Sequence, residues 1–273
     1  MNLTTLKDTP PWEWPEGTGK MLLDILRDDR TSESDLLLAA ELAGDLTVIN
    51  DELVEALLSV LRGGDRSEEV RGRAAISLGP VLEHADTQGF EDADDLPITE
   101  PAFHRLQESL RKLYRDANVP KEVRRRILEA SVRAPQDWHE DAIRAAYASG
   151  DEAWRLTAVF CMGFVRGFEE QILEALDTEN PDIHYEAVVA AGNWGLDAAW
   201  PHVAALVTSK KTDKPLLLAA IDAIASIRPR EAVGMLDDLA DSQDEDIAAA
   251  VEEAMAMAEG PSGEDDDDDD GPY

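Results

Sequence analysis

The chain has 273 residues, of which 44% are apolar and 5% aromatic. This composition can bury a hydrophobic core, which excludes a chain that is disordered throughout. Asp and Glu number 59 against 25 Lys and Arg, which gives a formal net charge of -34. A surface of this charge repels phosphate backbones and anionic lipids, so nucleic acids and membranes are disfavoured as partners and a basic protein or peptide is favoured.

The cellular location is predicted from what the sequence lacks. The single cysteine, Cys161, cannot form an internal disulfide, which fits a reducing compartment. The first residues show no cationic stretch followed by an apolar one, and no window approaches the roughly 18 apolar residues that a membrane span needs. These features predict a cytoplasmic protein that does not enter a membrane.

Residues 1–19 are rich in proline and tryptophan and are predicted to be an extended N-terminal segment. Gly17-Thr18-Gly19-Lys20, at its end, is similar to part of a phosphate-binding loop. It lacks the full glycine-lysine spacing of such a loop, has Met21 in place of a metal-binding hydroxyl, and follows no strand. The entry turn of a helix is therefore the favoured interpretation.

Residues 20–258 repeat one helical pattern. An anchor residue is followed by apolar residues at +4, +5 and +8 and by a small residue at +9, which places one apolar stripe on a helix. The anchors are Asp35, Val70, Val123, Trp154, Ile183, Leu216 and Ile247. A shorter amphipathic segment precedes each one, at residues 20–27, 52–62, 103–115, 138–148, 169–176, 199–207 and 231–240. The sequence therefore predicts an all-helical protein of about seven antiparallel helix pairs.

The turns between these segments carry the expected residues. Asn180-Pro181 places a capping amide before a proline in the first helical turn, and Pro120 and Pro215 are placed to start helices in the same way. Gly63-Gly64 and Ser149-Gly150 are typical of the turns that end helices.

Two acidic segments interrupt or follow the repeats. The interval between the anchors Val70 and Val123 exceeds the others by about 20 residues, and residues 86–100 are predicted to be an exposed acidic loop inserted there. Residues 259–273 include six consecutive aspartates and are predicted to be a disordered tail, because so charged a segment cannot bury apolar surface.

The phrase Val70-Arg71-x-x-Ala74-Ala75-x-x-Leu78-Gly79 resembles the second helix of a HEAT repeat, especially the short bacterial HEAT-like type. The resemblance covers about residues 20–258. It implies a right-handed α-solenoid whose second helices line a concave face, and it implies protein binding as the commonest activity of the family. Two departures are a repeat shorter than the usual ~40 residues and an aspartate, Asp35, at the first anchor.

No residues are predicted to be catalytic, to bind a cofactor or to ligate a metal. The histidines His84, His104, His139, His184 and His202 do not fall at metal-ligand spacing, and Cys161 has no cysteine partner. The cluster Trp138-His139-Glu140-Asp141 is interpreted as the start of a helix, where acids favour the helix dipole.

Two local features stand out against this background. Residues 101–135 hold nine basic and four acidic side chains, so an acidic group is expected to cover them: the inserted loop, the acidic tail, or a partner. Aromatic residues concentrate between positions 138 and 200, where they fill the core or serve as anchors for a partner. The candidate partner-binding residues are Phe160, Phe164, Tyr185, Trp194, Arg125 and Arg126.

The resulting hypothesis is a non-enzymatic scaffold or adaptor that binds a basic protein or peptide on its concave face. The alternative is a HEAT-like enzyme of the phycobilisome lyase or DNA glycosylase type, of which the glycosylase requires a positive groove that the net charge opposes. A third interpretation of the acidity is adaptation to a salty cytoplasm, which would say nothing of partners. The sequence sets neither the identity of a partner nor an oligomeric state.

Overall fold

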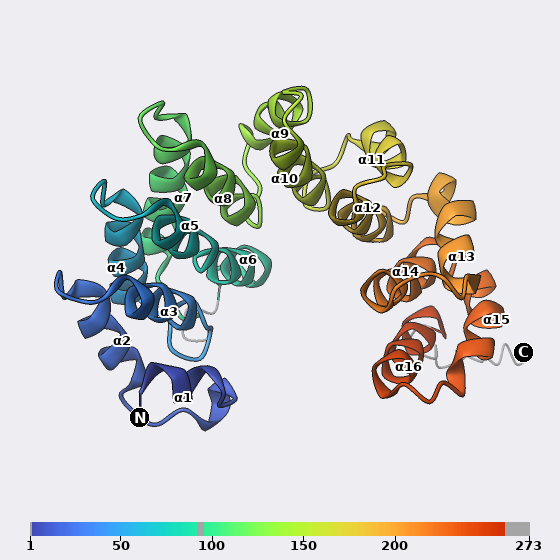
Figure 1. Cartoon of the computed structure of the whole chain (residues 1–273), viewed down its shortest axis with the longest axis horizontal. Coiled ribbons are helices and arrows are strands. Elements are labelled where there is room, and N and C mark those ends of the chain that lie inside the picture. Colours follow the sequence, from blue (N-terminus) through green and yellow to red (C-terminus); the bar gives the residue numbers. More distant parts are fainter. Residues whose placement is uncertain (1, 92–95, 260–273) are drawn as a thin grey trace, which may run out of the picture. The chain divides into compact units, whose positions relative to one another are not determined.

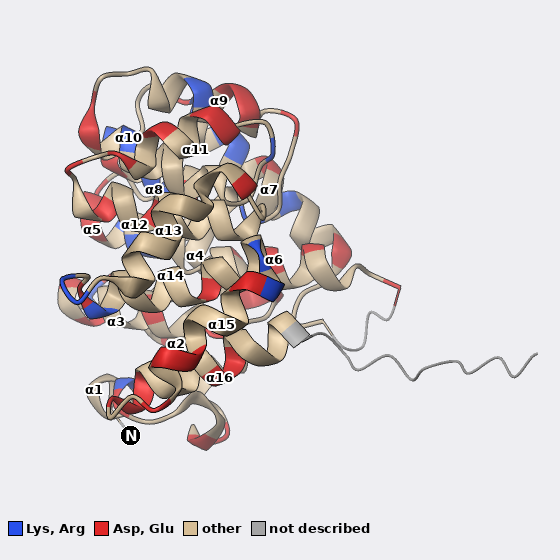
Figure 2. Ribbon diagram, turned by 90° about the vertical axis from the view of Figure 1, so that its right-hand side faces the viewer, with Lys and Arg blue, Asp and Glu red and all other residues tan. Residues whose placement is uncertain are grey.

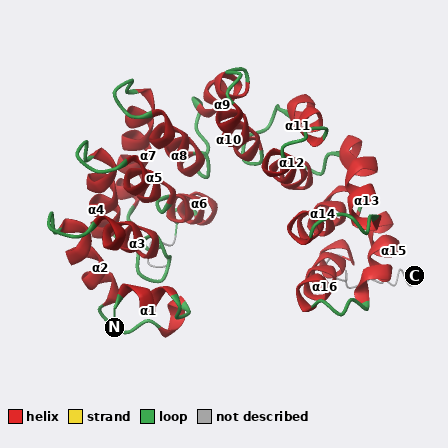
Figure 3. Cartoon of the chain, viewed as in Figure 1, coloured by secondary structure: helices red, strands yellow, loops and turns green. Residues whose placement is uncertain are grey.

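The structure is a computed structural model that describes residues 2–91 and 96–259. Within these residues it consists of helices and connecting loops, with no strand (Figure 3). The chain divides into two compact units whose boundary lies between Cys161 and Met162. The predicted all-helical repeat fold is confirmed.

The helices follow one another as pairs, as the repeat pattern predicts. The first helices of the pairs are α2 (Thr18–Arg27), α4 (Asp51–Arg62), α7 (Glu100–Arg115), α9 (His139–Tyr147), α11 (Glu169–Leu176), α13 (Trp200–Thr208) and α15 (Pro229–Ala240). The second helices are α3 (Glu33–Ala43), α5 (Glu68–Ile76), α8 (Lys121–Ser131), α10 (Glu152–Met162), α12 (Pro181–Asn193), α14 (Lys214–Ile227) and α16 (Glu245–Glu259).

Side chains of the flanking residues begin several of these helices where the sequence predicts. The side chain of Asn180 accepts hydrogen bonds from the backbone N–H groups of Asp182 and Ile183, directly before the proline that opens α12. Ser67 caps α5 in the same manner. Gly150, in the turn after α9, has a φ of 72°, a backbone conformation that favours glycine.

In the first unit the helices form two layers. Figure 1 shows α3, α5 and α8 lying side by side in one layer and α2, α4 and α7 in the other. Leu53, Leu57 and Leu78 are fully buried between them. In the second unit α12 packs on α14 and α14 packs on α16, around a core that includes Ile183 and Ile221.

The N-terminal segment is not extended. Residues Leu3–Lys7 form a short helix, α1, and Pro11–Glu13 form a turn of 3-10 helix, η1. Leu3 and Leu6 are buried, and the indole Nε1 of Trp14 donates to the carbonyl oxygens of Leu6 at 3.0 Å and Thr9 at 2.9 Å. The prediction of an extended segment is wrong because these apolar side chains find a surface on α3.

The insertion between the second and third pairs also differs from the predicted loop. A further helix, α6 (Gly79–Gln88), includes the first three residues of the predicted loop and packs on α8, with Val81, Leu82 and Ala85 buried. Residues 92–95 of the predicted acidic loop and residues 260–273 of the predicted tail lie outside the described residues.

In the second unit, a turn of 3-10 helix, η3 (Asp197–Ala199), leads into α13.

Candidate functional site

Charged side chains are buried together between α8 and α10 in the first unit. The Nε atom of Arg125 donates to Thr157 Oγ1 at 3.0 Å, and the same hydroxyl donates to Glu129 Oε1 at 2.7 Å. Arg125 is 5% exposed, Glu129 is 7% exposed and Thr157 is fully buried. Buried charges are costly unless they are paired, so this network must hold its geometry closely.

The outer end of the network reaches the surface through two further residues of α8. Glu122 accepts from Arg125 Nη1 at 2.6 Å, and Arg126 Nη1 donates to Glu129 Oε2 at 2.6 Å. Because Glu122, Arg126 and Glu129 are spaced at three and four residues, they lie on one face of the helix. That face connects the buried network to solvent.

Glu122 and Arg126 line an open hollow of about 560 Å³ over the contact between α5 and α8. Its other lining residues lie on one face of α5, and they are Glu68, Glu69, Gly72, Arg73 and Ile76. The two helices approach closely at Gly72, where a β-carbon would lie 3.2 Å from Arg126 Cγ. This volume lies within the range of small-molecule sites.

The carboxylates of this α5–α8 hollow outnumber its guanidinium groups. Arg126 is paired with Glu129, and Arg73 Nη1 lies 3.8 Å from Glu41 Oε2. Within residues 2–91 and 96–259, no basic side chain forms an ion pair with Glu68 or Glu69. The hollow therefore has two carboxylates available to a cation.

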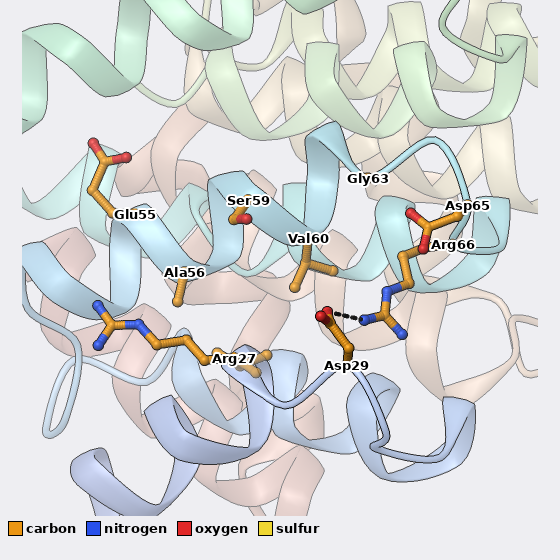
Figure 4. A pocket seen from close by; sticks show the side chains of 10 residues that line it. Arg27, Asp29, Glu55, Ala56, Ser59, Val60, Gly63, Asp65 and Arg66 are labelled. Carbon is orange, nitrogen blue, oxygen red and sulfur yellow. Dashed lines mark hydrogen bonds and ion pairs between the residues drawn. The ribbon is translucent and has the colours of Figure 1, made fainter.

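A second hollow, of about 300 Å³, lies on the other layer of the first unit, between α2, α4 and their loops. Figure 4 shows Arg27 and Glu55 at one end and the ion pair of Asp29 with Arg66, 3.4 Å apart, at the other. Arg27, Asp29, Glu55 and Asp65 are exposed and Arg66 is half-buried, so none of the charged side chains that line it is buried. It is the weaker candidate for a ligand site.

The segment that is similar to a phosphate-binding loop forms the start of a helix, as the sequence predicts. Gly17 has a φ of 86° and stands directly before α2, which begins at Thr18. The shallow hollow beside it is lined by Asp24 and Asp28 as well as Lys20. Carboxylates at this place disfavour a phosphate ligand.

Ser131 and His139 are close enough for a nucleophile and its base, but their hydrogen bonds exclude that role. The backbone N–H of Gln136 donates to His139 Nδ1 at 2.8 Å, so the ring proton lies on Nε2. That Nε2 lies 3.0 Å from Ser131 Oγ and donates to it, whereas a base would accept. His139 is fully buried, and burial lowers its pKa from 6.5 to about 4, so the ring stays neutral.

A pair of histidines, which the sequence spacing did not predict, meets in the second unit. The Nε2 atoms of His184 on α12 and His202 on α13 lie 2.7 Å apart, with the two rings nearly perpendicular. Both side chains are half-buried. Burial lowers the pKa of His184, and the neighbouring His202 lowers it further.

The predicted partner-binding aromatic residues differ in their exposure to solvent. Tyr185 on α12 is exposed, whereas Phe160, Phe164 and Trp194 are half-buried. The indole Nε1 of Trp194 donates to the carbonyl oxygen of Met162 at 2.7 Å, so this ring ties α12 to the end of α10 within the second unit. The guanidinium of Arg166 lies over the same ring, 4.3 Å from its centroid.

The two predicted basic residues share the network described above, in which Arg125 is buried and Arg126 reaches the surface. Whether any of the six predicted residues contacts a partner stays a prediction.

The basic segment at residues 101–135 finds its acidic partners inside the first unit. Four of its side chains pair with acids of other segments: Arg105 with Glu55, Arg111 with Asp137, Lys121 with Asp151, and Arg133 with Glu83. Acidic residues are also spread along helices of both units (Figure 2). Packing of the unit therefore accounts for much of this local charge.

Over the described ranges, no set of three or more His, Cys, Asp and Glu side chains is placed to hold a metal ion. In the same part of the chain, every helix is too short or too polar to cross a lipid bilayer.

No protein-family model matches the sequence, and no curated protein sequence matches it. Solved structures do. Human deoxyhypusine hydroxylase is 18% identical with a TM-score of 0.41, over 95% of this chain and 89% of that one. An archaeal HEAT-like repeats protein from Thermococcus onnurineus NA1 is 13% identical with a TM-score of 0.41, over 88% of this chain and 97% of that one. An engineered protein is 19% identical with a TM-score of 0.35, over 90% of this chain and 97% of that one.

These matches correct the functional hypothesis drawn from the sequence. A non-enzymatic protein-binding scaffold was expected because HEAT-like repeats commonly bind proteins, yet one chain similar to this one along nearly its whole length is named as a hydroxylase. The hypothesis that this chain is a non-enzymatic scaffold is therefore wrong as a deduction from the fold, and the alternative of a HEAT-like enzyme is left open. At these identities the likeness concerns the helical repeat fold alone, and it assigns no activity to this chain.

Proposed function

We propose that this chain binds a small organic cation, such as a diamine or a guanidino compound, in the α5–α8 hollow. The observation that carries the proposal is the pair of available carboxylates, Glu68 and Glu69, at the edge of a hollow of about 560 Å³. A protonated amine close to two carboxylates gains Coulomb energy that a neutral or anionic molecule of the same size does not.

The buried network gives this site a rigid base. Thr157 and Glu129 fix the guanidinium of Arg125, and Glu129 also fixes that of Arg126, whose aliphatic part lies against Gly72. Groups held by packing and by hydrogen bonds lose little freedom when a ligand binds, which favours affinity.

The same charges bear on the enzymatic alternatives. Surplus carboxylates at the hollow repel a phosphodiester backbone, which disfavours a DNA glycosylase. No described residue favours a bilin lyase. Chemical change of a bound amine is a separate question, which the binding experiment can also answer.

Two further predictions, on family and on cellular location, complete the proposal. Descent from the short HEAT-like repeats is supported by the Val70 to Gly79 phrase, whose Val70, Ala74, Ala75 and Leu78 are buried as the stripe requires. A cytoplasmic location is supported only by the presence of a single cysteine, Cys161, whose side chain is buried.

Isothermal titration with putrescine, butane-1,4-diol and succinate tests the proposal, because these probes have similar length and different charge. Putrescine should bind, the diol and succinate should not, and Glu68→Gln with Glu69→Gln should weaken putrescine binding at least tenfold. The matched control is Glu169→Gln with Glu170→Gln, which removes the same charge from two adjacent exposed acids in the first turn of α11.

Equal losses in the two double variants would show that putrescine binds the acidic surface at large and would overturn the proposal, as would binding of the diol. Mass spectrometry of putrescine after incubation with the wild-type chain reports whether the ligand is chemically altered.

A further inference from the structure

The histidine pair of the second unit has a geometry that the proposed function does not use. His184 lies on α12 and His202 on α13, 18 residues apart in sequence, and their Nε2 atoms face each other at 2.7 Å. A single hydrogen bond between two imidazoles satisfies one nitrogen of each ring, with one Nε2 donating and the other accepting. The same two nitrogens are the preferred donors for late transition metals.

We infer that His184 and His202 form a two-histidine site for one late transition-metal ion, such as Zn²⁺. Nitrogens bound at about 2.0–2.1 Å to one tetrahedral zinc ion lie roughly 3.3 Å apart. The two Nε2 atoms therefore have to move about 0.6 Å further apart than they lie in the structure. Small rotations of two half-buried side chains provide this. The proton of the hydrogen bond moves to Nδ1 of the same ring, so both imidazoles stay neutral and both Nε2 lone pairs face the metal.

The surroundings of the pair favour a cation. The carboxylates of Asp213, at the start of α14, and Asp177, at the end of α11, both act electrostatically on His184. Because the histidines are half-buried, solvent reaches them, and water molecules can complete the coordination of the ion. With two protein ligands the affinity should be modest, in the micromolar range, and not that of a closed structural zinc site.

The experiment uses the full chain without a histidine tag, titrated with Zn²⁺ in a large excess of Mg²⁺. Mg²⁺ prefers oxygen ligands and occupies the acidic surface without displacing imidazole. NMR of the imidazole nitrogens follows the titration. The Nε2 signals of both histidines should shift, and the shifts should saturate at one Zn²⁺ per chain.

His184→Ala and His202→Ala should each weaken Zn²⁺ binding at least tenfold. His104→Ala, which removes an exposed histidine of the first unit, should leave it within twofold. Circular dichroism checks that the variants stay folded, and His184→Gln offers a conservative replacement if the alanine variant unfolds. Unshifted signals for the pair, or Zn²⁺ binding that survives both single substitutions, would overturn the inference. This test is independent of the α5–α8 hollow, because it probes residues of the other unit.

Discussion

A methyl group on Gly44, at the end of α3, would lie 2.3 Å from the carbonyl oxygen of Ser77, at the end of α5. Gly44 has a φ of -81°, which any residue adopts, so contact alone demands glycine here. Gly44→Ala should therefore force α3 and α5 apart and cost about 2–3 kcal/mol of unfolding free energy. Urea denaturation followed by circular dichroism measures this loss.

Gly64→Ala is the matched control for Gly44→Ala. Gly64 is exposed in the loop after α4, and nothing lies within 4 Å of the place where its β-carbon would stand. The substitution should leave the stability unchanged or raise it slightly, because alanine reduces the freedom of the unfolded chain. A Gly44→Ala protein as stable as Gly64→Ala would show that α3 and α5 do not touch at this point.

The helix pairs could be predicted from sequence because each one repeats the same local pattern. The spacing from Val70 to Leu78 fixes which face of α5 is buried, and the side chain of Asn180 starts α12 where the sequence places it. Gly44 stands nine residues after the anchor Asp35, so the pattern predicts a small residue there but not its contact with Ser77. Helix α6 has no counterpart in the other pairs. Both the contact and the helix depend on what lies next to them in the folded unit, which the local repeat pattern does not reveal.

Thr157→Val should destabilise the first unit by about 1–3 kcal/mol. Valine keeps the shape of threonine, but Arg125 Nε and Glu129 Oε1 would lose the hydroxyl that joins them in the core. Thr157→Ser should restore most of the loss, because it returns the hydroxyl. Chemical denaturation of the three proteins provides the measurement.

A threonine with an exposed hydroxyl serves as comparison. Thr208 Oγ1 donates only to carbonyl oxygens of its own helix, such as that of Ala204 at 3.0 Å. Thr208→Val should change the stability by less than about 0.5 kcal/mol. If Thr157→Val were as mild, the hydroxyl of Thr157 would not link the two buried charges.

The candidate sites were harder to predict than the fold. Arg125 and Arg126 are adjacent in sequence, yet one is buried and the other lines the hollow. His184 and His202 are separated by a helix end, the segment η3 and a new helix, so no ligand spacing connects them in the sequence. Periodicity identifies the face of a helix, but the pairing of two faces comes from tertiary packing.

The buried histidine His139 should make stability depend on pH between about 6.5 and 4. Its pKa is 6.5 when unperturbed and about 4 in the folded chain, so the unfolded chain binds the proton more tightly. The contribution of the neutral ring is therefore fully present above pH 6.5 and is lost as the pH falls toward 4. From pH 7.5 to pH 5 the loss attributable to His139 should be about 2 kcal/mol.

Carboxylates also titrate as the pH approaches 4, so the measurement is a difference between two proteins. His139→Asn has no titrating group at this position, and the unfolding free energy of both proteins is compared at pH 7.5 and pH 5. The wild type should lose about 2 kcal/mol more than the variant over this interval. Parallel losses in the two proteins would mean that His139 is already charged, or freely solvated, in the folded chain.

Two aromatic residues that the sequence treats alike should differ in their effect on stability. Trp194→Phe keeps an aromatic ring but removes the N–H that donates to Met162 O at 2.7 Å, which should cost about 1–2 kcal/mol. Tyr185→Phe removes a hydroxyl from a residue that is 37% exposed, so it should change stability by less than about 0.5 kcal/mol. Urea denaturation of both variants, with circular dichroism at a helical wavelength, measures the two effects. If Trp194→Phe unfolded at the same urea concentration as the wild type, the indole hydrogen bond would not stabilise the second unit. Equal losses in both variants would show that the hydroxyl of Tyr185 also contributes to the stability of the fold.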